Sequence, residues 1–114
     1  MPRSDAYRIR TAPARDKPAK FTVAFGGGSG YVPQNERVWT TMARHKPLAF
    51  LTLGDNTYHD TPTRPDHQRY CYYRRQSRPE YRALVAHTAV FSIYDDHDFG
   101  TNDCVPGPEI KTPE

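Results

Sequence analysis

Two clusters of acidic, aromatic and imidazole side chains could do chemistry in this sequence. The first follows the apolar run Leu48–Leu53 and reads Gly54-Asp55-Asn56-Thr57-Tyr58-His59-Asp60. The second follows the apolar run Ala89–Ile93, after Tyr94, and reads Asp95-Asp96-His97-Asp98. Carboxylates and phenols are hard oxygen ligands, and adjacent carboxylates repel one another unless a cation lies between them. The two clusters therefore indicate a metal or catalytic site.

Three strands are expected to position these clusters. Short β-branched and aromatic runs predict buried strands over Phe21–Phe25, Leu48–Leu53 and Ala89–Ile93. Each strand ends in unusual residues: a glycine run, then the first acidic cluster, then the second. Strands joined by helices run parallel through right-handed crossovers, and their carboxyl ends meet at one edge of the sheet. The sequence thus predicts an α/β chain whose three strand-end loops converge.

Helices are expected between the strands. Apolar residues at helical spacing predict a helix over Pro33–His45, capped by Asn35, with Trp39 in the core. A second helix is predicted over Asp66–Gln76, with its tyrosines partly buried. A capping-box pattern over Ser77–Glu80 predicts the start of a third, which ends near His87.

The residues of the first cluster carry unequal expectations. Asp55 follows a strand and a glycine, a position that favours a ligand over a turn cap. Tyr58, three residues on, is a further candidate ligand, with simple packing as the alternative. Asn56 is equally compatible with a turn and with a place in the site. His59 and Asp60 are expected to lie behind the ligands or in solvent.

In the second cluster, adjacent acids are hard to explain by structure alone. Its imidazole, His97, is the best candidate for a proton donor. The carboxylates around it, of Asp95, Asp96 and Asp98, would repel one another unless a cation lay between them, so they are candidates for contacts to a metal, to its ligands or to the substrate. The glycine run Gly26–Gly30 either lets backbone approach a ligand or makes a tight turn, and without full nucleotide-binding spacing it is weak evidence for a nucleotide site.

The composition suggests part of a domain. Only 36% of the 114 residues are hydrophobic and 11 are proline, with a mean hydropathy of −0.88, whereas a free-standing domain usually has about 45–50% apolar residues. The part of the chain with enough apolar residues to form a core is close to Phe21–Phe99. Before it, the alternating pattern around Tyr7 and Ile9 predicts a short strand. A net charge of +3 suits an anionic partner, phosphate ester or nucleic acid, although basic runs are often solvated faces.

Compartment and membrane association are only partly constrained. Two cysteines, Cys71 and Cys104, allow at most one internal disulfide, and nothing in the sequence sets their distance. No apolar stretch approaches the ~20 residues of a membrane span. Residues 1–20 lack the apolar core of a signal peptide, so no secretion signal is expected in this chain.

Several of these motifs together resemble a known family. The Gly54-Asp55-x-x-Tyr58 element and the run from Asp95 to Asp103 resemble the alkaline phosphatase D-like (PhoD-like) metallophosphatases of the calcineurin-like superfamily. The strand Phe21–Gly26 is similar to the family's opening strand. Tyr7–Pro13 is similar to the last strand of a β-sandwich that often precedes the catalytic domain. The likeness covers almost the whole chain.

The resemblance implies a fold and a domain division. We expect a partial four-layer αββα metallophosphoesterase sandwich, of which this chain is the N-terminal half. Residues 1–20 would be the end of a preceding β-sandwich strand plus a linker, and residues 21–114 the first half of the catalytic domain. The remaining ligands would come from the missing C-terminal half.

The resemblance also implies roles for individual residues. Asp55 would bridge two metals, Tyr58 would bind a ferric ion, Asp96 would bind the second metal and His97 would be the catalytic histidine. The family uses iron with calcium on phosphate monoesters and diesters, and it is mostly exported. Gly28 stands where the family usually has a cysteine ligand, and glycine supplies no side-chain ligand.

Two functions from different classes follow. One is a metal-dependent phosphoester hydrolase, as a fragment with reduced or no activity alone because half of a dinuclear shell binds metal poorly. The alternative is a non-catalytic anion- or nucleic-acid-binding fragment that retains the fold. Asp55, Tyr58, Asp96 and His97 favour the first, whereas Gly28 and the missing ligands favour the second.

Overall fold

A three-stranded parallel sheet organises the chain, whose computed structural model describes residues 8, 10–105 and 107. The strands are β1 (Val23–Gly26), β2 (Ala49–Leu53) and β3 (Ala89–Ile93), in the order β1-β2-β3. Both neighbouring pairs are parallel, so β2 is central and all three strands end at the same edge. The predicted α/β class and parallel pairing are confirmed.

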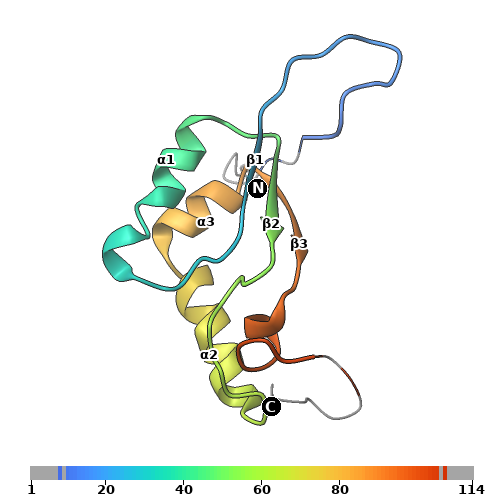
Figure 1. The fold of residues 1–114 in the computed structure, drawn as a ribbon. Coiled ribbons are helices and arrows are strands. Elements are labelled where there is room, and N and C mark those ends of the chain that lie inside the picture. The colour runs from blue at the N-terminus through green and yellow to red at the C-terminus, as the bar shows by residue number, and fades with distance from the viewer. Residues whose placement is uncertain (1–7, 9, 106, 108–114) are drawn as a thin grey trace, which may run out of the picture.

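The helices cover one face of this sheet (Figure 1). They are α1 (Val38–Arg44), α2 (Pro65–Gln76) and α3 (Pro79–Val85), with a short 3-10 turn, η1 (Pro33–Asn35), before α1. In a sheet whose strand order follows chain order, crossovers of one hand put every connecting helix on the same side. The other face of the sheet therefore has no helix of the described chain over it.

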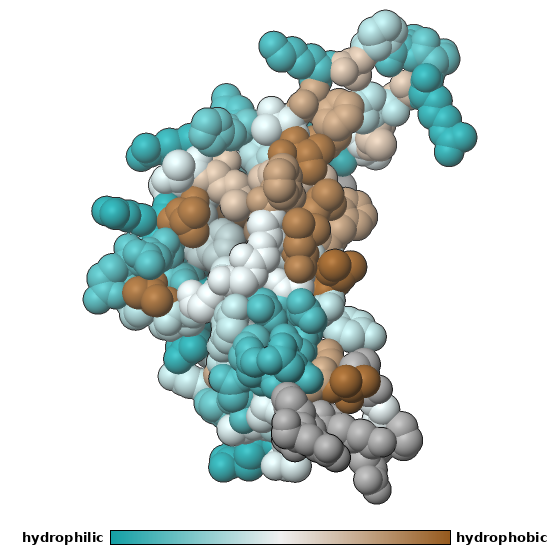
Figure 2. Space-filling model, viewed as in Figure 1, coloured by the Kyte–Doolittle hydropathy of each residue, from teal (hydrophilic) through white to brown (hydrophobic). Residues whose placement is uncertain are grey.

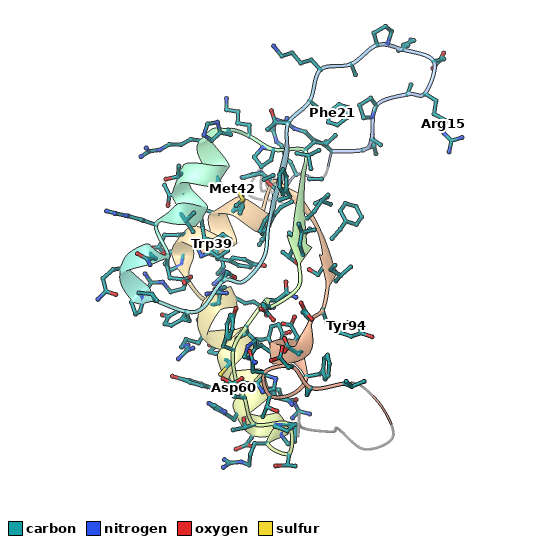
Figure 3. All side chains as sticks on the ribbon, viewed as in Figure 1. Arg15, Phe21, Trp39, Met42, Asp60 and Tyr94 are labelled. Carbon is teal, nitrogen blue, oxygen red and sulfur yellow. The ribbon has the colours of Figure 1, made fainter. Side chains whose placement is uncertain are left out.

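The core lies between the sheet and α1 and α3. Trp39, Phe50 and Leu84 are buried there, and the Trp39 and Tyr81 rings meet edge to face with centroids 5.2 Å apart. Figure 3 shows Trp39 and Met42 on the side of α1 that faces the sheet. The core position predicted for Trp39 is confirmed.

The opposite face of the sheet is an apolar surface, visible in Figure 2 as brown side chains over the strands. Side chains alternate between the two faces of a strand, so one residue in two points away from the helices. Phe25, Phe91 and Ile93 on this face have 71%, 61% and 61% of their surface exposed. We call the exposed side chains of Val23, Phe25, Leu53, Phe91 and Ile93 the open sheet face.

Several local expectations were wrong. The predicted first helix is divided, with η1 and α1 in place of one helix over Pro33–His45, and Asn35 makes no cap. The Ser77–Glu80 capping box is not formed: α3 begins after Arg78 without a side-chain cap, and the Ser77 hydroxyl donates to the Arg74 carbonyl. Two of the tyrosines expected to be partly buried are largely exposed: Tyr70 (55%) and Tyr73 (69%).

Two remaining expectations concern the N-terminus and the cysteines. Tyr7 and Ile9 lie outside the described residues, and Arg10–Ala12 is not a strand. Cys71 and Cys104 are both buried and unpaired as thiols. Within the part of the chain that the structure describes, no helix has the length and apolar character needed to cross a membrane.

Truncating the core leucine should destabilise the fold far more than truncating an exposed one. Leu84→Ala is expected to lower the free energy of unfolding by about 2–5 kcal/mol, because the side chain is 1% exposed and leaves a cavity. Leu53→Ala is the matched control, since half of Leu53 is already exposed, and should cost less than about 1 kcal/mol. Urea unfolding of both variants checks this, and equal losses would contradict the core assignment.

Candidate metal centre

The two acidic clusters meet because β2 and β3 are neighbours. Leu53 and Ile93 are partners in the parallel register, so the loops that follow them leave the sheet side by side. Gly54 is where they approach most closely: its φ is 88°, and a Cβ at this position would lie 2.7 Å from the Asp95 Cβ. Only glycine fits this contact without displacement, which explains the glycine before Asp55.

Three side chains from the two clusters converge on one point. Ligand atoms of Asp55, Asp96 and His97 all lie within 4.8 Å of one another, and each residue is half-buried. Asp55 adopts the left-handed region with φ 49°, a strained conformation for a non-glycine residue. Its Oδ1 is buried without a hydrogen-bond partner among the described residues. A buried carboxylate oxygen left in this way fits a cation, so these three residues can hold a metal ion.

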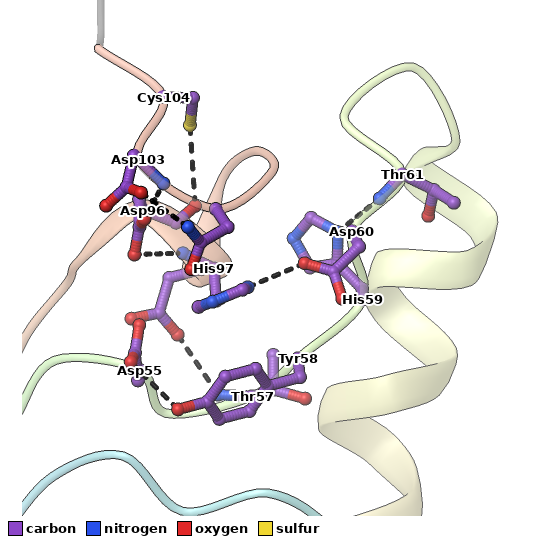
Figure 4. A network of polar contacts seen from close by, with 12 residues as sticks. Asp55, Thr57, Tyr58, His59, Asp60, Thr61, Asp96, His97, Asp103 and Cys104 are labelled. Carbon is purple, nitrogen blue, oxygen red and sulfur yellow. Dashed lines mark hydrogen bonds and ion pairs between the residues drawn. The ribbon is translucent and has the colours of Figure 1, made fainter. Parts of the chain in front are cut away.

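Tyr58 contacts this group directly (Figure 4). Its hydroxyl donates to Asp55 Oδ2 at 2.9 Å, and its ring lies against the His97 ring with centroids 4.3 Å apart. The hydrogen bond to Asp55, with burial and the surrounding carboxylates, raises the pKa of the Tyr58 phenol. In the metal-free molecule the phenol therefore keeps its proton and shares it with the carboxylate.

His97 is held by a carboxylate that we expected only behind the ligands or in solvent. Its Nδ1 donates to Asp60 Oδ1 at 2.6 Å, which leaves Nε2 as the ring nitrogen free to meet a cation or a substrate oxygen. Burial lowers the pKa of His97, but the Asp60 bond and the charges of Asp60, Asp96 and Asp55 outweigh it, so the net shift is upward. Asp60 is thus a direct contact of His97. The backbone of Asp60 is in the left-handed region, with φ 46°, where its carboxylate meets the His97 ring.

Asp96 is oriented by backbone donors from its own loop. The Asp96 carboxylate accepts hydrogen bonds from the Asp103 N–H and, at 2.9 Å, from the His97 N–H. Both bonds lower the pKa of Asp96, and the bond from Asp103 has the larger effect. The Cys104 thiol donates to the Asp96 carbonyl at 3.8 Å. The loop from Asp96 to Cys104 therefore holds the Asp96 carboxylate ionised at the edge of the group.

Asp98 has a structural position between the clusters. Its carboxylate accepts from the Asn56 N–H at 2.8 Å, the Thr57 N–H at 3.2 Å and the Tyr72 hydroxyl at 2.7 Å. It also accepts from the Asp95 N–H, completing a capping box on the 3-10 turn η2 (Asp96–Asp98). Burial and the bond to Asp98 raise the pKa of Tyr72. With its oxygens engaged, Asp98 joins the two loops rather than facing a ligand.

Asn56 and Asp95 have parts in the same junction. The Asn56 amide donates to the Ile93 carbonyl at 2.8 Å and to Asp98 at 3.1 Å, so one side chain bridges the ends of the two strands. The Asp95 carboxylate accepts from the Asp96 N–H. Both residues support the loop geometry. His59, predicted to be near the ligands or in solvent, is buried (3% exposed) and its Nδ1 accepts from the Thr61 N–H.

The glycine run lies against the same edge. The Gly28 N–H donates to the Gly54 carbonyl and the Ser29 N–H to the Asp55 carbonyl, which extends the β1–β2 contact into the loops. Gly28 has φ 64°, and a Cβ built there would lie 3.7 Å from the Tyr58 hydroxyl. Position 28 thus lies beside Tyr58, and its glycine has no side chain that could be a ligand.

Arg75 is the residue that sequence reasoning missed. One guanidinium nitrogen donates to the Ser29 carbonyl at 2.6 Å, to Ser29 Oγ at 2.8 Å and to the Asn56 carbonyl at 2.9 Å. The other pairs with Glu36 at 3.2 Å, and both side chains are buried. Arg75 therefore fastens the glycine run and the Asp55 loop to each other. In the sequence Arg75 is one of several arginines between Arg64 and Arg82, and nothing there sets it apart. Only its buried partners in the folded chain distinguish it from the others.

Comparisons of the chain with protein-family models, with curated proteins and with solved structures give no match. The geometry of the site itself is therefore what indicates function.

Asp60→Asn should lower the pKa of His97 in the metal-free protein. The folded-state pKa lies above the ordinary value, so the pair stabilises the fold below about pH 6.5, and this contribution is lost as the pH rises through the raised pKa. NMR titration of the His97 ring protons measures the shift. Asp66→Asn, at an exposed position in the first turn of α2, is the control and should leave the pKa of His97 unchanged.

Arg75→Ala should destabilise the chain much more than Arg74→Ala. Removing Arg75 leaves Glu36 as an unpaired buried charge and frees two loops, so a loss of about 3–5 kcal/mol is expected. Arg74 lies with its guanidinium carbon 4.0 Å from the Tyr31 ring centroid, a stacking contact whose removal costs about 0.5–1 kcal/mol. Urea unfolding separates them; a smaller loss for Arg75→Ala would contradict its role.

Proposed function

We propose that this chain carries the catalytic residues of a metal-dependent phosphoester hydrolase of the PhoD-like type. The observation that carries the proposal is the convergence of Asp55, Asp96 and His97, with one buried Asp55 oxygen left without a partner. The donors that would hold the metal are carboxylates and a phenol, without a thiolate, which suits hard cations, and the imidazole of His97 lies beside them. Metal centres with such ligands are the usual machinery for hydrolysing phosphate esters.

Asp55, Tyr58 and Asp96 are the residues that would hold the metal. When bound, the metal supplies Lewis acidity toward phosphoryl oxygens and lowers the pKa of a water molecule. An iron–calcium pair is the more specific form of the proposal, and Asp55 would be among the residues that hold it. The phenol of Tyr58 supports it, since it already lies 2.9 Å from an Asp55 oxygen and becomes a ligand once its proton leaves.

His97 would act as the proton donor to the leaving-group oxygen. Its Nδ1 is occupied by Asp60, which orients the ring and favours its protonated form. The Tyr58 ring against one face of the imidazole restricts its rotation. Asp60 and Tyr58 thus position the His97 ring. The loop that carries them contains two residues with left-handed backbone, Asp55 and Asp60.

The open sheet face supports the more specific fold. A parallel sheet is normally covered on both faces, and large exposed apolar surfaces mark an interface. We propose that a second sheet packs on this face, which would make the four-layer αββα sandwich. Flat rows of Phe25, Phe91 and Ile93 at alternating positions are the pattern that a facing sheet about 10 Å away would complete.

Asp55→Asn should remove hydrolysis if the proposal is correct. Wild type is assayed on p-nitrophenyl phosphate and on bis-p-nitrophenyl phosphate with iron, calcium, manganese or zinc added, together with Asp55→Asn and the remote control Asp66→Asn. A fall of roughly a hundredfold or more is expected for Asp55→Asn alone, since metal affinity depends on that ligand. If the wild type hydrolyses either ester above background, equal rates for all three proteins would overturn the enzyme proposal and leave the anion- or nucleic-acid-binding alternative.

Iron loading should produce visible colour if Tyr58 becomes a ligand. A phenolate bound to ferric iron absorbs in the visible range through charge transfer, so Tyr58→Phe should abolish the band while iron remains bound. Tyr94→Phe is the control, because the Tyr94 hydroxyl belongs to an exposed ring packed on Phe99. A band that survives in Tyr58→Phe would show that another residue is the ligand.

A further inference from the structure

Two pockets lie at the amino-terminal edge of the sheet, where the residues that precede the three strands, Thr22, Leu48 and Thr88, line them. The first, of about 550 Å³, lies between the loop of residues 10–22 and the turn that precedes β2. The second, of about 390 Å³, lies between that turn and the end of α3. Arg10 and Lys46 line both, so the two are neighbours, and we call them the paired pockets.

Every ionisable side chain that lines the paired pockets is basic: Arg8, Arg10, Lys20, Lys46 and His87. The one acid among the described residues before β1, Asp16, lines neither pocket. Arg10, Lys20 and Lys46 are exposed, and none of them has an ion-pair partner in the described part of the chain. Positive charges gathered in this way, without acids between them, attract an anion.

Backbone hydrogen bonds fix the segments that carry these charges. The Arg8 N–H donates to the Ala86 carbonyl at 3.0 Å, and the Leu48 N–H donates to the Thr22 carbonyl at 2.8 Å, so both ends of the loop are attached. The Lys46 N–H donates to a carbonyl of the last turn of α1 at 3.0 Å. The paired pockets therefore take their charges from segments that are distant in the sequence and held together by the fold.

Phe21 adds an aromatic surface to the first pocket. The side chain is 56% exposed and follows Lys20 directly, just before β1 begins. Proteins that bind single-stranded nucleic acid combine a basic groove, which follows the phosphates, with aromatic rings on which the bases stack. A simple anion such as inorganic phosphate would use the charges and leave the Phe21 ring in water.

We propose that the paired pockets bind a single-stranded nucleic acid. Phosphates of neighbouring nucleotides contact Arg10, Lys20 and Lys46, and a base stacks on Phe21. Figure 3 shows Phe21 at the opposite end of the molecule from Asp60, which contacts His97 in the candidate metal centre. The site is therefore separate from that centre and does not depend on the proposed hydrolase function.

A labelled oligothymidylate of about 12 nucleotides is the probe, and fluorescence anisotropy with the full chain measures its affinity. EDTA in the buffer prevents any metal-dependent cleavage of the probe. The logarithm of the binding constant should fall with the logarithm of the salt concentration with a slope of about −2, because three cations meet phosphates and each contributes about −0.7.

An abasic strand of the same length and charge separates base recognition from attraction to a polyanion. This strand should bind about tenfold more weakly than the oligothymidylate, because no base stacks on Phe21. Equal affinity for the two strands would make the paired pockets a general polyanion site and overturn the proposal. An absence of saturable binding by the oligothymidylate would overturn it as well.

Variants at exposed positions test the location of binding. Arg10→Gln and Lys46→Asn should each make the salt slope shallower by about 0.7; asparagine tolerates the left-handed backbone of Lys46, whose φ is 49°. Phe21→Ala should weaken the oligothymidylate about tenfold and leave the abasic strand unchanged. Arg69→Gln, at an exposed position of α2 outside both pockets, is the matched control and should change neither slope nor affinity. An unchanged slope in Arg10→Gln and Lys46→Asn, or an unchanged affinity in Phe21→Ala, would overturn the site.

Discussion

The hydrogen bonds accepted by Asp98 are the interactions on which the candidate centre depends. One carboxylate takes N–H groups from the loop after β2 and a hydroxyl from α2, and it also closes the turn η2 that carries Asp96 and His97. Donors to an ionised carboxylate form strong bonds and compensate its burial. Because Asp98 is satisfied in this way, the negative charge that remains without a partner is concentrated on Asp55, at the point where a cation fits.

Strand order determines what else the molecule presents. Chain-order strands with crossovers of one hand place α1, α2 and α3 over a single face, so the two faces of the same sheet differ in kind. The helical face is closed near Phe50 and hollow near Gly26, where the side chains become small. The other face carries exposed apolar side chains. The candidate metal ligands lie at neither face but at the shared edge of the sheet, where the two acidic clusters follow β2 and β3.

Sequence patterns predicted what is local and missed what depends on distant partners. The strand Ala89–Ile93 has its predicted bounds because a short apolar run ended by polar residues suffices to define it. The capping box predicted at Ser77 does not form, whereas one that was not predicted forms between Asp95 and Asp98. The sequence placed the acids together but did not show which would be hydrogen-bonded, since that is decided by contacts such as Asn56 with Asp98, 42 positions apart. The burial of Arg75 was missed for the same reason, because its partners Ser29 and Glu36 also lie far from it in the sequence.

That separation along the chain also has a kinetic consequence. The contact between Asn56 in the Asp55 loop and Asp98 in η2 joins residues 42 positions apart, across the whole crossover from β2 to β3. Contacts with large loop-closure entropy form late in folding. If these contacts form after the transition state, a cation held by Asp55 and Asp96 would slow unfolding and leave the folding rate nearly unchanged. Metal at this edge would therefore lengthen the lifetime of the folded state more than it would speed its formation.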